Sequence, residues 1–338
     1  MPATMGGNSM RQHEEAFDAR IVAELSDAEI GLVRSACDEL GYPAPRSVMD
    51  GQFVFFAAFD GTNNDRLNLS LSGTPQQTNA AQLFDQVDSQ RAVDSRLRTG
   101  YFAGVGCGGE LGSFDARSSN PTPYIVATAE RAYQVFAREA SRWLEEGPST
   151  RLLDGVCVAI TGFSRGAGAA VQFARLVNDR GLQFAGKTLM PPLAVRVAAA
   201  LLLDPVLTKI ELDLTLPPNL TGHAVAVRAR HEYRYMFRAA DYSADARIRT
   251  IEVPGNHGNI GGMYDNGIGA LVLQGATAFF RACAVPIADV PPSRRFDMVR
   301  PVRIYTEGVD RYQNRIWSES GSRGATRLTG PVNNIRPD

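Results

Sequence analysis

The chain has 338 residues, 44% of them hydrophobic, so it can bury the core of one large α/β domain with extensions or of two smaller domains. This composition excludes a disordered or fibrous protein. The 35 basic residues nearly balance the 36 acidic ones, so no global positive field attracts a polyanion, and we expect no nucleic-acid partner.

The cysteines and the N-terminus favour a protein made in a reducing compartment. The four cysteines are scattered, with neither the spacing of a zinc site nor the density of a disulfide framework. The first 20 residues hold no apolar stretch typical of a secretory signal or membrane anchor. The sequence therefore predicts synthesis in the cytoplasm without a signal peptide, and no metal or other cofactor.

Residues 1–50 form an acidic N-terminal extension, with nine acidic residues against four arginines. Ser26 and Glu29 have the spacing of a capping box ahead of apolar residues at helical intervals. This pattern predicts a helix of about four turns.

Strands and helices alternate over residues 51–285. The run "GQFVFFAAFD" is apolar until Asp60, which is typical of a strand buried on both faces. The remaining elements follow the apolar periodicity: strands near 155–161, 194–204, 223–229 and 247–253, and helices near 79–87, 124–146, 168–179 and 268–284. The sequence thus predicts an α/β fold, with a mostly parallel sheet covered by helices on both faces.

Residues 286–338 differ in composition, with nine arginines against six acidic residues and several prolines. We expect a C-terminal extension that either adds edge strands, through "VRPVRIYT", or lies on the surface.

The stretch "TGFSRGAG", residues 161–168, holds a GxSxG motif between a predicted buried strand and a predicted helix. A nucleophile elbow requires this position, where the Ser164 hydroxyl emerges at the end of the sheet. Gly162 and Gly166 leave room for the strained turn, and the backbone N–H of Arg165 at the helix N-terminus can stabilise an oxyanion. The Arg165 side chain is expected in an ion pair or in solvent. The alternative is a structural serine in a tight turn.

His257 and Asp204 are the candidate partners of Ser164. His257 follows the last predicted strand in "PGNHGNIGG", at the edge where an α/β sheet gathers its functional loops. Asp204 ends the strand after the serine unit, and the order Ser164, Asp204, His257 is that of α/β hydrolases. Asp241 is the reserve acid. A turn histidine and a strand-end aspartate are the structural alternatives.

The stretch "FDGTNND" contains Asp60 and invites three functional interpretations besides that of an ordinary turn. Phosphatases of the haloacid dehalogenase type need a nucleophilic aspartate two residues earlier, where this chain has Ala58. The glycine and acid spacing does not fit an EF-hand calcium loop. We expect instead that Gly61 or Thr62 supplies a second oxyanion N–H while Asp60 braces the loop; an ordinary turn aspartate is the alternative. The later "GVGCGG" lacks the βαβ surroundings of a dinucleotide site and is expected to be a flexible loop.

Five blocks resemble the GFSRGA-class α/β hydrolases, a family that includes bacterial type VI secretion phospholipase effectors. The blocks span about residues 53 to 284: "AAFDGTNN", "YFAGVG", "ITGFSRGA", "LLLDPV" and "VPGNHGNIGG". The family's catalytic residues fall on Ser164, Asp204 and His257. The chain departs from the family at Asn259, where an aspartate is typical, and at Met263, where a glycine is typical.

The resemblance implies phospholipase A activity on membrane glycerophospholipids, with peripheral membrane contact. It also implies export from the bacterial cytoplasm by a secretion machine to a target cell, and a cognate immunity protein. From the residues we expect a serine hydrolase of carboxylic esters. The alternatives are a soluble carboxylesterase or thioesterase with the same triad, and a binding module that kept the fold and lost the chemistry.

Overall fold

A computed structural model of the chain describes residues 19–41, 46–107, 120–147, 155–232, 234, 237–264, 267–299, 301–307 and 323–332. Its centre is a six-stranded sheet in the order β11-β9-β7-β4-β2-β3, with every neighbouring pair parallel. The strands of this sheet are β2 (Phe53–Phe59), β3 (Leu97–Phe102), β4 (Val156–Phe163), β7 (Arg196–Leu203), β9 (Leu220–Ala229) and β11 (Ile248–Val253). The predicted α/β fold with a parallel sheet is confirmed.

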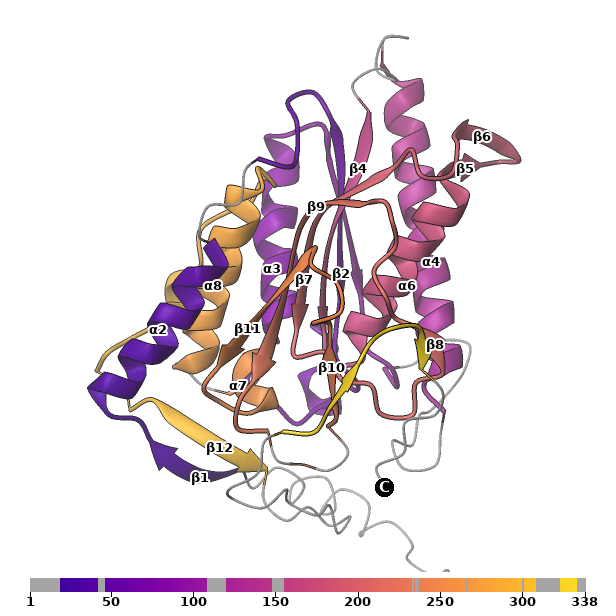
Figure 1. Cartoon of the computed structure of the whole chain (residues 1–338). Coiled ribbons are helices and arrows are strands. Elements are labelled where there is room, and N and C mark those ends of the chain that lie inside the picture. Colours follow the sequence, from indigo (N-terminus) through magenta and orange to yellow (C-terminus); the bar gives the residue numbers. More distant parts are fainter. Residues whose placement is uncertain are drawn as a thin grey trace, which may run out of the picture.

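Helices cover both faces of the sheet (Figure 1). On one face lie α2 (Asp27–Gly41), α3 (Asn79–Asp88) and α8 (Ile268–Ala282); on the other lie α4 (Thr122–Glu145) and α6 (Gly166–Arg180). A sheet covered on both faces needs strands that are apolar at every position, and β2 and β4 are buried throughout.

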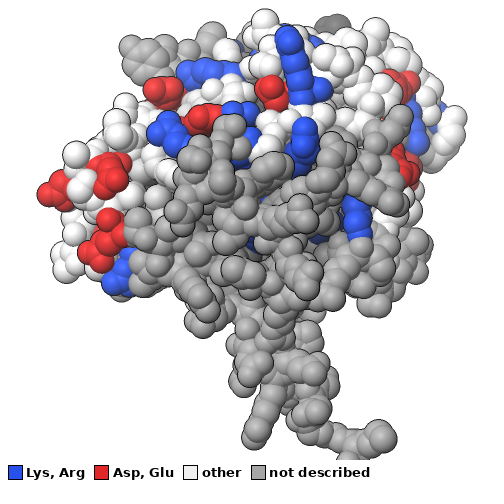
Figure 2. All heavy atoms as spheres, turned by 60° about the horizontal axis from the view of Figure 1, so that its bottom comes forward, with Lys and Arg blue, Asp and Glu red and all other residues white. Residues whose placement is uncertain are grey.

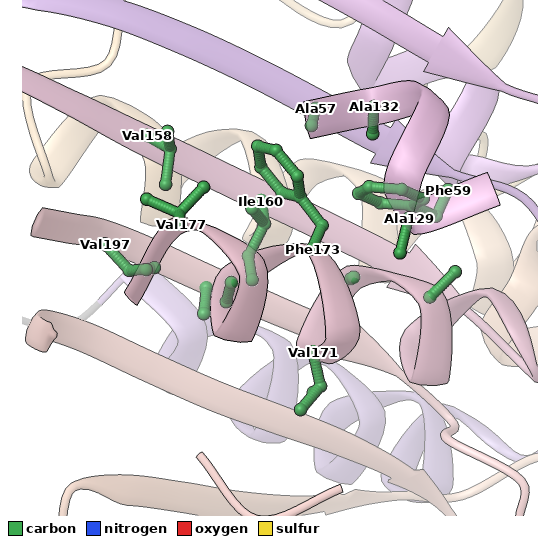
Figure 3. Packing of buried hydrophobic residues seen from close by; sticks show 14 of the residues in the cluster. Ala57, Phe59, Ala129, Ala132, Val158, Ile160, Val171, Phe173, Val177 and Val197 are labelled. Atoms are coloured by element: carbon green, nitrogen blue, oxygen red, sulfur yellow. The ribbon is translucent and has the colours of Figure 1, made fainter. Parts of the chain in front are cut away.

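Alternate side chains of β2 pack into two separate hydrophobic cores. Phe53, Phe55 and Phe59 belong to the core under α4 and α6, whereas Val54 and Phe56 belong to the core under α3 and α8. Figure 3 shows the first of these cores, where Phe173 of α6 lies among strand and helix side chains. The two cores hold the sheet rigid, and with it the loops at the carboxyl ends of its strands.

The edge strand β3 was not predicted. Its sequence "LRTGYF" carries Arg98 and Thr99, which are only partly buried because an edge strand has a neighbour on one side alone. The predicted capping box of α2 is confirmed: the backbone N–H of Ser26 donates to Glu29 at 2.8 Å, and the N–H of Glu29 donates to the Ser26 hydroxyl at 3.4 Å.

Short strands join the two terminal extensions to each other and the C-terminal extension to the core domain. β1 (Ala19–Glu24) pairs with β12 (Arg303–Glu307), β10 (Ala239–Asp241) with β13 (Ala325–Arg327), and β8 (Leu212–Asp213) with β14 (Pro331–Val332). β5 (Leu182–Phe184) and β6 (Lys187–Met190) form a hairpin. The remaining short helices are η2 (Leu69–Leu71), η3 (Ser89–Ala92), α7 (His257–Gly261) and η4 (Pro292–Arg294). In Figure 1 the yellow C-terminal segment runs past β10 to β8.

Among the helices of the described ranges, none combines the length and the apolar character needed to cross a bilayer.

Candidate active site

Ser164 lies on the sharp turn between β4 and α6, as the motif predicted. Its φ is +57°, a left-handed conformation that is uncommon for a non-glycine residue, costs energy and is often found at active sites. The turn is held by hydrogen bonds from the Ser164 N–H to Leu203 O at 3.0 Å and from Ala167 N–H to Ser164 O at 3.1 Å. These backbone hydrogen bonds therefore hold Ser164 in its strained conformation.

The two glycines of the motif are required by close packing. A Cβ at Gly162 would lie 2.6 Å from the Cα of Ala167, and one at Gly166 would lie 2.3 Å from the backbone oxygen of Asp60. Both distances are too short for any side chain. The glycines thus allow α6 to begin directly beside Ser164 and against the Asp60 loop.

Asp204 and His257 meet at the carboxyl edge of the sheet. The Oδ2 atom of Asp204 lies 2.6 Å from Nδ1 of His257, and both side chains are buried. Asp204 follows β7 with a φ of +42°, and its Oδ1 accepts the N–H of Ala229 at 2.8 Å. His257 begins α7, where Asn256 and Asn259 form a reciprocal capping box.

The imidazole of His257 is enclosed by two aromatic rings. Phe163, the residue before Ser164, stacks on it with a centroid distance of 4.6 Å, and Phe237 meets it edge-on at 4.8 Å. Ser164 and His257 share no hydrogen bond within the described part of the chain. Such contacts are often long without substrate and shorten when it binds.

Two buried groups that the sequence did not indicate complete this environment. The guanidinium of Arg323 forms an ion pair with Oδ1 of Asp204, and Oε2 of Glu232 accepts the backbone N–H of His257 at 3.2 Å. Glu232 is itself paired with Arg234 at 2.8 Å. Glu232 follows the end of β9 by three residues, in "RARHEYR", and an acid so close to a strand end is a signal that could have been noticed. Arg323 left no local signal.

The pKa values of both acids lie below their usual range. Burial disfavours the ionised form of Asp204, but the charge of Arg323 and the hydrogen bond from His257 outweigh it, so its pKa is lowered. Burial of Glu232 is likewise outweighed by Arg234, which lowers the pKa of Glu232. Both groups are therefore carboxylates at neutral pH.

Asp60 organises the loop after β2. Its carboxyl group accepts hydrogen bonds from the hydroxyls of Thr78 at 2.8 Å and Tyr101 at 2.7 Å, and from the N–H of Gly61 at 2.8 Å. The N–H of Gly61 is thus engaged by Asp60 and does not point to the serine. Burial raises the pKa of Asp60 to about 6, against the hydrogen bonds that lower it.

Thr62 lies next to the helix N-terminus. The Nε–H of Arg165 donates to the Thr62 hydroxyl at 2.8 Å, and burial lowers the pKa of Arg165 to about 10. This arginine is buried rather than solvated. The "GVGCGG" stretch contributes Gly104, where a Cβ would lie 1.6 Å from the backbone oxygen of Gly61, so the two loops are in direct contact.

The reserve acid Asp241 bonds to its own turn: its carboxyl oxygens accept the N–H and the hydroxyl of Ser243. His231 accepts the N–H of Gly255, two residues before His257, at 3.0 Å. A cavity lined by Asp60, Gly104 and Gly166, among others, measures about 10 Å³, room for roughly one water molecule. The described residues hold no cluster of three metal-ligating side chains.

The face that lies at the bottom of Figure 1 is turned forward in Figure 2. On its described part, basic and acidic side chains lie among one another, so no field of a single sign distinguishes that part.

Neither a family model nor a curated protein matches the sequence. Among solved structures, an uncharacterized protein from Pseudomonas aeruginosa is 16% identical, with a TM-score of 0.48, over 81% of this chain and 52% of that one. The Tle1 effector, solved bound to the VgrG spike of the type 6 secretion system, is 19% identical, with a TM-score of 0.46, over 66% and 52%. A protein of unknown function from Agrobacterium tumefaciens, whose description proposes an α/β hydrolase, is 10% identical, with a TM-score of 0.35, over 73% and 93%.

The chain spans about half the length of the first two of these proteins. At these identities the likeness concerns the fold alone. The parallel sheet and the strand-turn-helix unit at Ser164 are those of an α/β-hydrolase fold.

Proposed function

We propose that the protein is a serine hydrolase of carboxylic esters, with Ser164 as nucleophile, His257 as general base and Asp204 as the acid that orients it. The observation that carries the proposal is the buried 2.6 Å contact between Asp204 and Nδ1 of His257, close to a serine held at positive φ. A carboxylate at Nδ1 fixes the tautomer with its proton there, which leaves Nε2 as the proton acceptor.

The reaction follows from these positions. Nε2 of His257 takes the hydroxyl proton as the Ser164 oxygen attacks the acyl carbon, and the resulting oxyanion is bound by the N–H groups of Arg165 and Thr62. The imidazolium then gives its proton to the departing alcohol. Water, deprotonated by the same imidazole, hydrolyses the acyl-enzyme and frees Ser164. The engagement of the Gly61 N–H by Asp60 favours Thr62 as the second donor.

Acyl phospholipid is the substrate class we favour, because the five sequence blocks resemble a family that includes phospholipases. The same resemblance motivates export from the bacterial cytoplasm, contact with secretion machinery and an immunity partner. A soluble carboxylesterase or thioesterase would use the same three residues. It would differ in preferring short, soluble esters.

The test measures fatty-acid release from diacyl phospholipid vesicles and hydrolysis of a short soluble ester. Ser164→Ala is compared with Ser141→Ala, a buried serine of α4 far from the chemistry in sequence. We expect release from vesicles that is lost in Ser164→Ala and kept in Ser141→Ala. Activity on the soluble ester alone would move the substrate to the esterase class.

A binding module is distinguished by covalent labelling. A fluorophosphonate should label the wild-type protein at Ser164 and leave Ser164→Ala unlabelled. Full activity of Ser164→Ala, or no labelling of a folded wild-type protein, would end the proposal.

A further inference from the structure

Arg323 is carried into the active site by the C-terminal segment. Its side chain is 4% exposed although it precedes a short strand near the end of the chain. One guanidinium nitrogen pairs with Oδ1 of Asp204 and donates to Ala229 O, and Nε and Nη2 both donate to Phe237 O, at 3.2 and 2.9 Å. All three guanidinium nitrogens thus donate hydrogen bonds, which hold the planar group in one orientation.

The segment that carries Arg323 is anchored by backbone contacts to β10 and β8. Gly324 O accepts the N–H of Ala239 at 3.0 Å, β13 pairs with β10, and Leu328 N–H donates to Asp241 O at 2.8 Å. Further on, β14 pairs with β8. Residues 323–332 therefore form a strap across the strand ends that place Asp204.

Arg323 and His257 contact different oxygens of the Asp204 carboxylate. Oδ2 faces Nδ1 of His257, while Oδ1 is held by Arg323 and by the N–H of Ala229, so the carboxylate cannot turn away from the imidazole. Among the residues that the structure describes, the charged groups linked to His257 by these contacts are Asp204, Glu232, Arg234 and Arg323. The two negative charges of this described set are balanced by its two positive charges.

We propose that Arg323 is a positioning residue of the active site, which fixes the Asp204 carboxylate toward His257 and offsets its negative charge, so that the strap 323–332 is a required part of the catalytic centre. This inference rests on the proposed function, since it assigns a role in the chemistry of His257. Without the guanidinium, the imidazole faces an excess of negative charge and binds a proton more readily. The base form needed for attack is then reached only at higher pH.

The experiment records kcat and KM for a short soluble ester against pH, together with the thermal unfolding midpoint. The variants are Arg323→Met, Arg323→Lys and, as matched control, Arg327→Met, at an exposed arginine of β13 in the same strap. For Arg323→Met we expect a fall in kcat of about 10- to 100-fold at pH 7, with KM nearly unchanged. The acid limb should also move upward by about one pH unit. Arg323→Lys keeps the charge, so its acid limb should stay in place while kcat falls.

A purely structural role for Arg323 would lower activity equally at all pH values. An unshifted acid limb in Arg323→Met, or the same kcat as in Arg327→Met, would overturn the inference. Should Arg323→Met fail to fold, Arg323→Lys decides: a lowered kcat at unchanged KM supports the inference and wild-type kcat overturns it. A failure of the proposed function would give a different result: Ser164→Ala would then keep the activity of the wild type.

Discussion

The buried carboxyl group of Asp60 should make the stability of the protein depend on pH. Its side chain is 1% exposed, and burial raises its pKa from 3.8 to about 6. In the unfolded chain the pKa returns to its ordinary value, so between pH 4 and pH 6 the folded protein holds a proton that the unfolded chain has released. Stability from this group is fully present below pH 3.8 and is lost as the pH rises through about 6.

The size of the effect follows from the difference between the two pKa values. About two pH units, at about 1.4 kcal/mol each, correspond to ~3 kcal/mol of unfolding free energy. Asp60→Asn has no proton to release, so the difference in stability between wild type and variant should change by this amount between pH 4 and pH 7. The variant should be relatively more stable at the higher pH.

The assay is urea unfolding at several pH values between 4 and 7. Taking the difference between wild type and Asp60→Asn at each pH removes the contributions of all other titrating groups, as well as any constant cost of altered hydrogen bonding to Thr78 and Tyr101. Asp38→Asn, at an exposed carboxyl group of α2, is the control for replacing a carboxyl group by an amide. A constant difference for Asp60→Asn would show that Asp60 is ionised in the folded protein throughout this range, and would refute the reasoning.

Two further substitutions test the packing and the charge of the site. Gly166→Ala places a Cβ 2.3 Å from Asp60 O and should destabilise the protein by about 1–3 kcal/mol in urea unfolding. The control is Gly31→Ala in α2, where a Cβ would have no atom within 4 Å. This substitution should stabilise the protein by about 0.5–1 kcal/mol. Equal effects of the two substitutions would count against close packing at the elbow. Asp204→Asn leaves Arg323 buried without its counter-charge and should cost about 3–5 kcal/mol at pH 7. Because the pKa of Asp204 is lowered, the stability that its carboxylate contributes is present above pH 3.8 and is lost as the pH falls further. The difference in unfolding free energy between wild type and Asp204→Asn should therefore narrow only in acid. A difference that narrows already at pH 6 would contradict this.

The core elements could be predicted because their patterns are local. The apolar run of β2 and the helical spacing in α4 each identify an element from a short window of sequence. The edge strand β3 escaped prediction because its polar positions face outward at the rim of the sheet. Placing the domain boundaries at residues 50 and 285 stays a prediction. The pairing of β1 with β12 joins the two extensions, and the pairing of β10 with β13 joins the C-terminal extension to the core; both span too much sequence to leave a periodic signal.

In the candidate site too, residues with a local sequence signal could be predicted and the others could not. Ser164 could be placed because the residues before and after it form a strand and a helix, and Asp204 and His257 because each ends or follows a strand at one edge of the sheet. Arg323 lies 119 residues from Asp204, and nothing in "SGSRGATR" marks it as buried. The oxyanion donors were also difficult to choose from sequence, since Gly61 and Thr62 are adjacent and only the geometry of Asp60 separates them.

Burying Asp204 and Glu232 beside one imidazole would be costly without compensation, since each carboxylate loses its hydration. Arg234, two residues from Glu232, supplies one counter-charge locally. Among the described residues the second comes from Arg323, far along the sequence, so within that set the charges around His257 balance when the C-terminal strap is in place. A chain ended at residue 285 would keep every motif residue, Ser164, Asp204 and His257, and yet leave the Asp204 carboxylate buried without its counter-ion. We therefore expect the block from 53 to 284 to be insufficient for activity by itself, even though it contains the whole sequence signature.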